Sequence, residues 1–159
     1  MDPISLLKED HATVKDLFRR FNEAPEGSGD IKWDICQDVI GEITVHSTIE
    51  ERIFYPALRE IGGREENDLV AQSLKEHEEV TALMDEINEM GMDDPDCEGK
   101  FQTLIEKVEG HIQEEEDELF PTAQELLADR FEDMAEEMTQ LKRQIAPAAQ
   151  TRSAGSRGG

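Results

Sequence analysis

The sequence is poor in positive charge and in cysteine, and each shortage excludes a class of protein. Its 159 residues include 16 Lys and Arg against 39 Asp and Glu, a formal net charge of −23. Nucleic acids and anionic membranes bind clustered positive charge, so we expect neither as a partner. The two cysteines, Cys36 and Cys97, lie far apart and form no CxxC or Cys/His spacing, so no disulfide framework or zinc site is indicated. We interpret both as ordinary thiols in a reducing cytoplasm.

Two further absences concern membranes and targeting. No apolar run approaches the ~20 residues that a helix needs to cross a bilayer. The N-terminus lacks the order of basic, apolar and small residues that marks a signal peptide. The sequence therefore predicts a soluble protein of the cytoplasm.

What the sequence does have is apolar residues at helical spacing, which predicts an all-α fold. The expected helices span residues 4–25, 31–62, 65–90 and 95–127, with Pro56 expected to kink the second or end it early. Short polar turns between long helices are typical of an up-down-up-down four-helix bundle. A short C-terminal helix is expected from Phe131 to about Ile145. This gives one domain over 1–146 and a disordered tail over 147–159, which is rich in Ala, Ser, Gly and Arg.

An internal duplication links the histidines of the chain. His11 and His77 each begin a similar segment, with Val and Leu three and six residues later. His46 and His111 each begin a longer one, His-x-x-x-Glu-Glu, and six residues after that first glutamate both continue with proline. The chain therefore reads as two helical hairpins, each bearing one His followed by one His-x-x-x-Glu.

The His-x-x-x-Glu spacing indicates a metal site inside the bundle. Residues i and i+4 lie on one helix face, so His46 with Glu50, and His111 with Glu115, direct an imidazole and a carboxylate to the same point. A lone histidine on an apolar face is more often a hydrogen-bonded core residue than a ligand. The duplication and the placement of all four histidines on apolar faces of different helices favour ligands instead. The predicted ligands are His11, His46, Glu50, His77, His111 and Glu115, with the two glutamates as bridges between two metal ions.

The donor set narrows the choice of metal. Imidazole nitrogens and carboxylate oxygens suit iron, manganese or zinc. Two metals that share four imidazoles and two carboxylates keep open positions, which favours a redox metal, and iron is our first choice. The open positions leave room for an oxo or hydroxo bridge and a small ligand such as O2, peroxide or NO.

This order of motifs on four successive helices resembles the hemerythrin-like family, also described as the HHE cation-binding domain. The resemblance covers about residues 4–127 and includes the Phe54-Tyr55-Pro56-Ala57 and Leu119-Phe120-Pro121 segments after the motifs. It implies a non-haem di-iron centre in a four-helix bundle, with roles in O2 binding, in sensing of iron or oxygen, and in defence against peroxide or NO during oxidative stress.

Two positions depart from the O2-carrying hemerythrins. Those carriers have a second histidine four residues after the one on the third helix, where this chain has Thr81, and an Asp at i+5 of the last motif, where it has Glu116. One imidazole fewer favours turnover of peroxide or a different ligand over reversible O2 carriage. Tyr55 is the candidate substitute ligand, because Pro56 could redirect it. Its alternative interpretation is a core aromatic with a hydrogen-bonded hydroxyl, since a regular helix would point it away from His46.

Three functions stay open on these residues. The first is a di-iron protein that binds or reacts with O2, peroxide or NO, with catalase-like decomposition of peroxide as its enzymatic form. The second is an oxygen or iron sensor, or an iron-binding module, without turnover. The third is an acidic helical interaction protein without metal. We expect Glu51, Glu114 and Glu116 to be solvated or to support the ligands from outside.

Overall fold

The computed structural model describes the backbone of residues 2–158 and the side chains of residues 2–146. The elements follow one another as α1 (Pro3–Glu23), α2 (Gly29–Ile49), η1 (Glu50–Phe54), α3 (Tyr55–Ile61), α4 (Arg64–Met90), α5 (Cys97–Glu114), η2 (Glu115–Leu119), α6 (Phe120–Leu126), η3 (Ala128–Arg130) and α7 (Phe131–Gly158). Here η1 and η2 are π-helical turns and η3 is a 3-10 turn.

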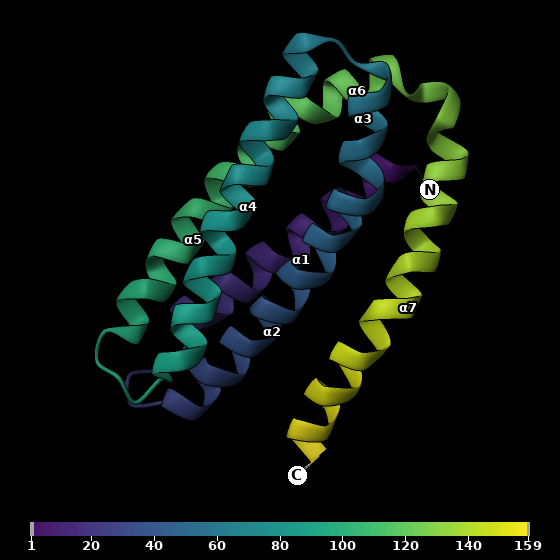
Figure 1. Ribbon diagram of the computed structural model, residues 1–159. Helices are drawn as coiled ribbons and strands as arrows, with labels where there is room; N and C mark the ends of the chain where they lie inside the picture. The colour runs from purple at the N-terminus through teal and green to yellow at the C-terminus, as the bar shows by residue number, and fades with distance from the viewer. Residues whose placement is uncertain (1, 159) are drawn as a thin grey trace.

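The architecture is an up-down-up-down four-helix bundle (Figure 1). Its long rods are α1, the continuous α2-η1-α3, α4, and the continuous α5-η2-α6. The α1–α2 and α4–α5 connections lie at one end of the bundle and the α3–α4 connection at the other. The all-α bundle predicted from the sequence is therefore confirmed, and the described residues contain no strand.

Local signals account for where the helices begin and end. The Asp2 side chain accepts a hydrogen bond from the Ser5 backbone N–H at 2.9 Å and so caps α1, with Pro3 in the first helical turn. At the other end of the bundle, Gly91 has φ +76° after α4, a left-handed conformation that is easy only for glycine.

Both motif helices contain a π-helical turn directly after the His-x-x-x segment. The Tyr55 N–H bonds to the Glu50 carbonyl, five residues back, and the Phe120 N–H bonds to the Glu115 carbonyl in the same way. A proline follows each turn; having no N–H, it cannot continue the regular pattern. At Pro56, where a kink or an early end of the helix was expected, the helix instead contains one wider turn and continues as α3.

The apolar core is divided into two clusters by the level of the histidines. One cluster contains Phe18, Phe21 and Phe101 together with the two cysteines. The other contains Leu7, Phe54, Tyr55, Phe120 and Met138. On α1, His11 lies between Leu7 of one cluster and Val14 of the other, so the polar level is closed by apolar side chains on both sides.

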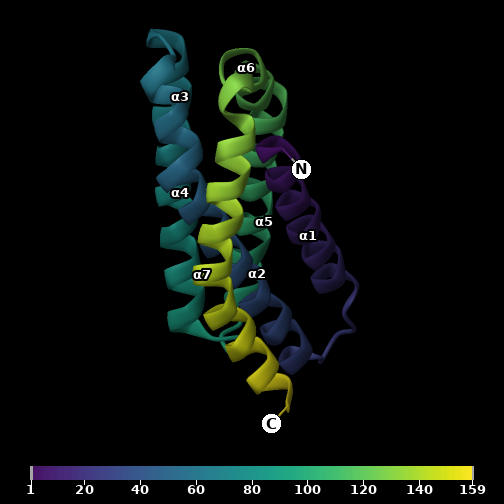
Figure 2. The same cartoon turned by 90° about the vertical axis from the view of Figure 1, so that its right-hand side faces the viewer.

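Helix α7 lies along one side of the bundle, against α1, α2 and η1 (Figure 2). Met134 and Met138 pack into the second cluster and are each 2% exposed. The predicted fifth helix is present, and its bounds extend beyond Ile145. The predicted disordered tail over 147–159 lies outside the residues whose side chains are described and stays a prediction. Within the described chain, we find no helix with the length and apolar character needed to span a membrane.

Candidate metal centre

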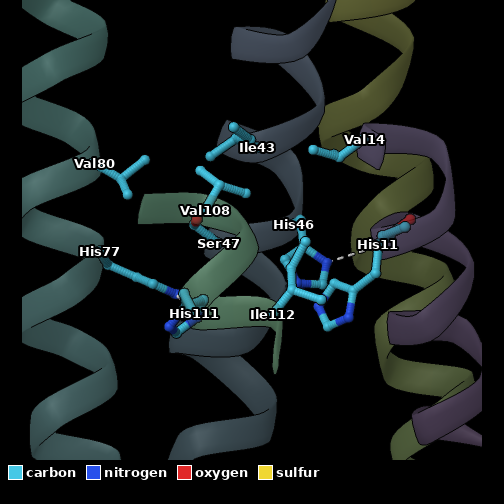
Figure 3. Close-up of a pocket in the computed structure, with 11 residues that line it drawn as sticks. His11, Val14, Ile43, His46, Ser47, His77, Val80, Val108, His111 and Ile112 are labelled. Carbon is cyan, nitrogen blue, oxygen red and sulfur yellow. Dashed lines mark hydrogen bonds and ion pairs between the residues drawn. The ribbon is translucent and has the colours of Figure 1, made fainter. Parts of the chain in front are cut away.

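The four histidines lie at one level of the bundle, each on a different long helix. His11 is on α1, His46 on α2, His77 on α4 and His111 on α5, and none is more than 9% exposed. They form two pairs, His11 with His46 and His77 with His111, with ring centroids 4.9 Å apart within each pair (Figure 3). Each pair comes from one hairpin of the duplication. We call the first pair and its surroundings the first half of the site, and the second pair the second half.

Glu50 joins the two halves. Its side chain is 0% exposed, and its Oε1 lies 3.3 Å from His46 Nε2 and 3.2 Å from His77 Nε2. These two histidines belong to opposite hairpins. A carboxylate that faces one histidine of each half has the arrangement that a bridge between two metal ions needs.

Glu115 occupies the equivalent position in the duplicated hairpin. Its Oε1 lies 3.1 Å from His11 Nε2 and its Oε2 lies 3.5 Å from His111 Nε2, so its two oxygens face different halves. The ligand-type atoms of the six predicted side chains fall into two compact groups, which share Glu50: His11, His46, Glu50 and Glu115 in one, and Glu50, His77 and His111 in the other. The structure therefore brings all six of these sequence-predicted side chains together.

Tyr55 is also part of this cluster. Its side chain is 1% exposed, and its hydroxyl donates a hydrogen bond to Glu115 Oε2 at 2.6 Å. The Tyr55 hydroxyl oxygen also lies 3.2 Å from Glu50 Oε1, 3.2 Å from His77 Nε2 and 3.5 Å from His111 Nε2. The π-helical turn η1 explains this orientation, because the added residue rotates position 55 onto the face that carries Glu50.

Each histidine also has a carboxylate on its outer ring nitrogen. The contacts are His11 Nδ1 to Glu116 Oε2 at 2.8 Å, His46 Nδ1 to Asp10 Oδ2 at 2.9 Å, His77 Nδ1 to Glu51 Oε2 at 2.8 Å, and His111 Nδ1 to Glu76 Oε1 at 2.7 Å. A carboxylate that accepts the Nδ1–H bond fixes the ring orientation and directs the Nε2 lone pair inward, as metal-binding histidines require.

Asp10 and Glu76 are the residues that sequence reasoning missed. Each directly precedes the first histidine of its hairpin and contacts the second histidine of the same hairpin. Glu51 and Glu116, which were expected to be solvated or to support the ligands, contact the histidine of the opposite hairpin. The missed signal was an acidic residue immediately before both His11 and His77.

The buried carboxylates Glu50 and Glu115 favour protonated histidines and a protonated Tyr55 hydroxyl beside them. Burial alone would lower the pKa of His46, but the Glu50 carboxylate raises it well above its ordinary value. Burial likewise opposes protonation of His111, yet its hydrogen bonds to Glu115 and Glu50 raise its pKa to about 11. Burial raises the pKa of the Tyr55 hydroxyl, and the two carboxylates raise it further. Metal cations at this position would supply the positive charge instead and release these protons.

The donor atoms present fit such cations. Among the described residues, His46 Nε2 and Glu50 Oε2 are buried without a well-aligned hydrogen bond. An unsatisfied buried polar group costs about 1–3 kcal/mol, and both atoms are of the kind that iron, manganese or zinc binds. Burying Glu50 and Glu115 together, each 0% exposed, would be costly without positive charge between them.

A cavity of about 30 Å³ lies beside the histidines (Figure 3). Its walls are the four histidines, Asp10, Ser47 and the apolar side chains of Val14, Ile43, Val80, Val108 and Ile112. That volume holds one or two water-sized molecules. The neighbouring space therefore suits a small ligand and excludes a bulky organic one.

Comparison with known proteins agrees with the fold and with the chemistry of the site. The family model described as the hemerythrin HHE cation binding domain matches residues 2–123. The uncharacterized protein Rv2633c of Mycobacterium tuberculosis and an uncharacterized protein of Mycobacterium bovis are each 25% identical over 121 residues, which are 76% of this chain and 71% of theirs. A crystal structure of a hemerythrin HHE cation binding domain-containing protein from Mycobacterium kansasii, an Rv2633c homologue, is 26% identical. It superposes with a TM-score of 0.72 over 96% of this chain and 99% of its own.

The family match covers most of the chain and includes both hairpins, and the buried histidines and glutamates form clusters able to hold a cation. The chain belongs to the hemerythrin HHE cation-binding domain family.

Proposed function

We propose that the chain holds a dinuclear non-haem iron centre. In the first half, His11, His46 and Glu115 are the ligands of one ion. In the second half, His77, His111 and Tyr55 are ligands of the other, with Glu50 shared. The two groups of donor atoms that meet at Glu50 support this assignment, because each has three or more ligand-type atoms within 4.8 Å of one another.

The position of the Tyr55 hydroxyl among the candidate ligands supports a function beyond cation binding. The position where O2 carriers have their additional histidine is Thr81, which is exposed here. The Tyr55 hydroxyl, in contrast, lies 3.2 Å from His77 Nε2 among the candidate ligands. A phenolate in place of an imidazole stabilises the ferric state and so disfavours simple reversible carriage of O2.

The function we infer is decomposition of peroxide, in which two H2O2 become two H2O and one O2. A bound pair of iron ions would supply the redox change, since one peroxide is reduced and the other oxidised. Tyr55 would lose its hydroxyl proton on binding a metal ion, and Glu115 Oε2, which already accepts a hydrogen bond from this hydroxyl at 2.6 Å, is the nearest carboxylate oxygen to take it. The small cavity beside the histidines has room for peroxide and keeps out larger molecules.

Peroxide consumption by the iron-loaded protein tests this function. We expect O2 evolution from H2O2 that is lost in His77→Ala and strongly reduced in Tyr55→Phe, and that is unchanged in Glu78→Gln, an exposed position beside the same histidine. An iron-loaded protein that consumes no peroxide would contradict the enzymatic proposal. Reversible binding of O2 or NO by that protein would then favour the alternative, a sensor without turnover.

A further inference from the structure

The outer carboxylate of His46 differs from the other three. Glu116, Glu51 and Glu76 have side chains that are 30%, 45% and 19% exposed, whereas the Asp10 side chain is only 8% exposed. Asp10 also has a second partner: Lys142 Nζ on α7 donates a hydrogen bond to Asp10 Oδ1 at 2.6 Å. Only here, among the four outer carboxylates described, does a lysine contact the group that holds a histidine.

The register of α7 explains why Lys142 reaches this point. Met134, Met138 and Lys142 follow one another at intervals of four residues and therefore lie on one helix face. The two methionines are buried against the bundle, so the same face carries the lysine stem inward while 42% of its side chain stays exposed. Asp10 contacts His46 with Oδ2 and Lys142 with Oδ1, so its two oxygens connect α7 to the histidine.

We propose that Lys142 is a positioning residue that sets, through Asp10, how strongly the His46 imidazole donates to a metal ion. Lys142 draws charge from Asp10 and so weakens the pull of this carboxylate on the His46 Nδ1–H. The hydrogen-bond partners of a ligating histidine determine its donor strength. This inference rests on the proposed metal centre at His46 and assigns to α7 a role in tuning one of its two halves.

Lys142 and Asp10 should have opposite effects on the balance between ferric and ferrous iron. Removing Lys142 leaves Asp10 to pull harder on His46, which makes the imidazole a stronger donor and favours ferric over ferrous iron. Removing the Asp10 charge weakens the donor and favours ferrous iron. A purely structural loosening of α7 or α1 would not give opposite signs.

Redox titration of the iron-loaded full chain tests the proposal. Lys142→Met keeps the apolar stem, and we expect it to raise the ratio of ferric to ferrous iron at a fixed potential by about 10-fold, a 59 mV lower potential for a one-electron couple. Asp10→Asn should shift the potential upward. Lys142→Arg keeps the positive charge and should keep the wild-type potential. Lys107→Met, which removes an exposed lysine paired with Glu79, should also leave the potential unchanged.

Two controls separate this idea from its alternatives. Lys142→Met should have a much smaller effect in the Asp10→Asn background, because the lysine then has no carboxylate to act on. Cobalt(II) titration gives a readout without redox chemistry: we expect Asp10→Asn to bind the ion about 10-fold to 100-fold more weakly. An unchanged potential in Lys142→Met, or an equal shift in both backgrounds, would overturn the inference. Failure of the wild type to bind iron or cobalt would instead overturn the proposed centre itself.

Discussion

The first and second halves of the site are built alike, each from the two long helices and one π-helical turn of its hairpin and with two outer carboxylates, yet each half has a group that the other lacks. The Tyr55 hydroxyl contacts the second half, whereas the equivalent residue of the other hairpin, Phe120, has no hydroxyl and stacks on His11 with ring centroids 5.5 Å apart. Lys142 reaches the first half through Asp10. Duplication can thus build a symmetric ligand cage, while single side chains placed on one side make its two metal positions chemically different.

The largest effect should come from Glu50, which belongs to both groups of donor atoms. We expect Glu50→Gln to weaken iron binding in both halves, by at least ~100-fold, because it removes the charge between them. His46→Ala should weaken only the first half and leave about half of the iron bound. Iron per chain after passage over a chelating resin distinguishes these results. Equal losses in the two variants would mean that the halves do not bind independently.

Six side chains of the site could be predicted from the sequence, because the motifs that contain them are local. Helical spacing fixes the face shared by His46 and Glu50, and the duplication supplies the second copy. The structure brings the six predicted side chains together, although their role as metal ligands stays a prediction. The sequence allows two interpretations of Tyr55, since its orientation depends on a π-helical turn that spacing alone does not reveal. The Lys142 contact depends on how α7 docks after a turn, which no local pattern encodes.

Tyr55→Phe should make the two halves more alike and give the next largest effect. Loss of the hydroxyl removes a ligand from the second half but keeps the buried ring, so the fold should be maintained. We expect loss of the visible phenolate-to-iron absorption and about 10-fold weaker iron binding in that half. An optical spectrum checks the first point, and zinc-loaded wild type, which has no such band, serves as its control. An unchanged spectrum would assign Tyr55 to the core instead.

Glu51 and Glu116 offer a test of the symmetry itself. They occupy equivalent places in the two hairpins and contact His77 and His11 at the same distance of 2.8 Å. Because both side chains are partly exposed, Glu51→Gln and Glu116→Gln should each weaken cobalt binding only several-fold, and by similar factors. Glu79→Gln, on the exposed face of α4, is the matched control. A large effect in one variant alone would break the symmetry of the outer carboxylates.

At neutral pH the smallest effect concerns the apolar cluster far from Tyr55, to which each hairpin contributes one free cysteine. Cys36 and Cys97 are both 0% exposed, and burial raises the pKa of Cys36 to about 12. The folded state therefore keeps a proton that the unfolded chain releases above its ordinary thiol pKa. Stability should be fully present below about pH 8.5 and fall toward pH 12, by up to ~1.4 kcal/mol per pH unit for this thiol. Urea unfolding of wild type and Cys36→Ala across this range would reveal the difference in slope; parallel curves would contradict it.

Diffraction from iron-loaded crystals at the iron absorption edge tests the central proposal most directly. We expect two anomalous peaks in each chain, one beside His11, His46 and Glu115 and one beside His77, His111 and Tyr55, with Glu50 between them. A single peak, or a second peak out of reach of the Tyr55 hydroxyl, would contradict it.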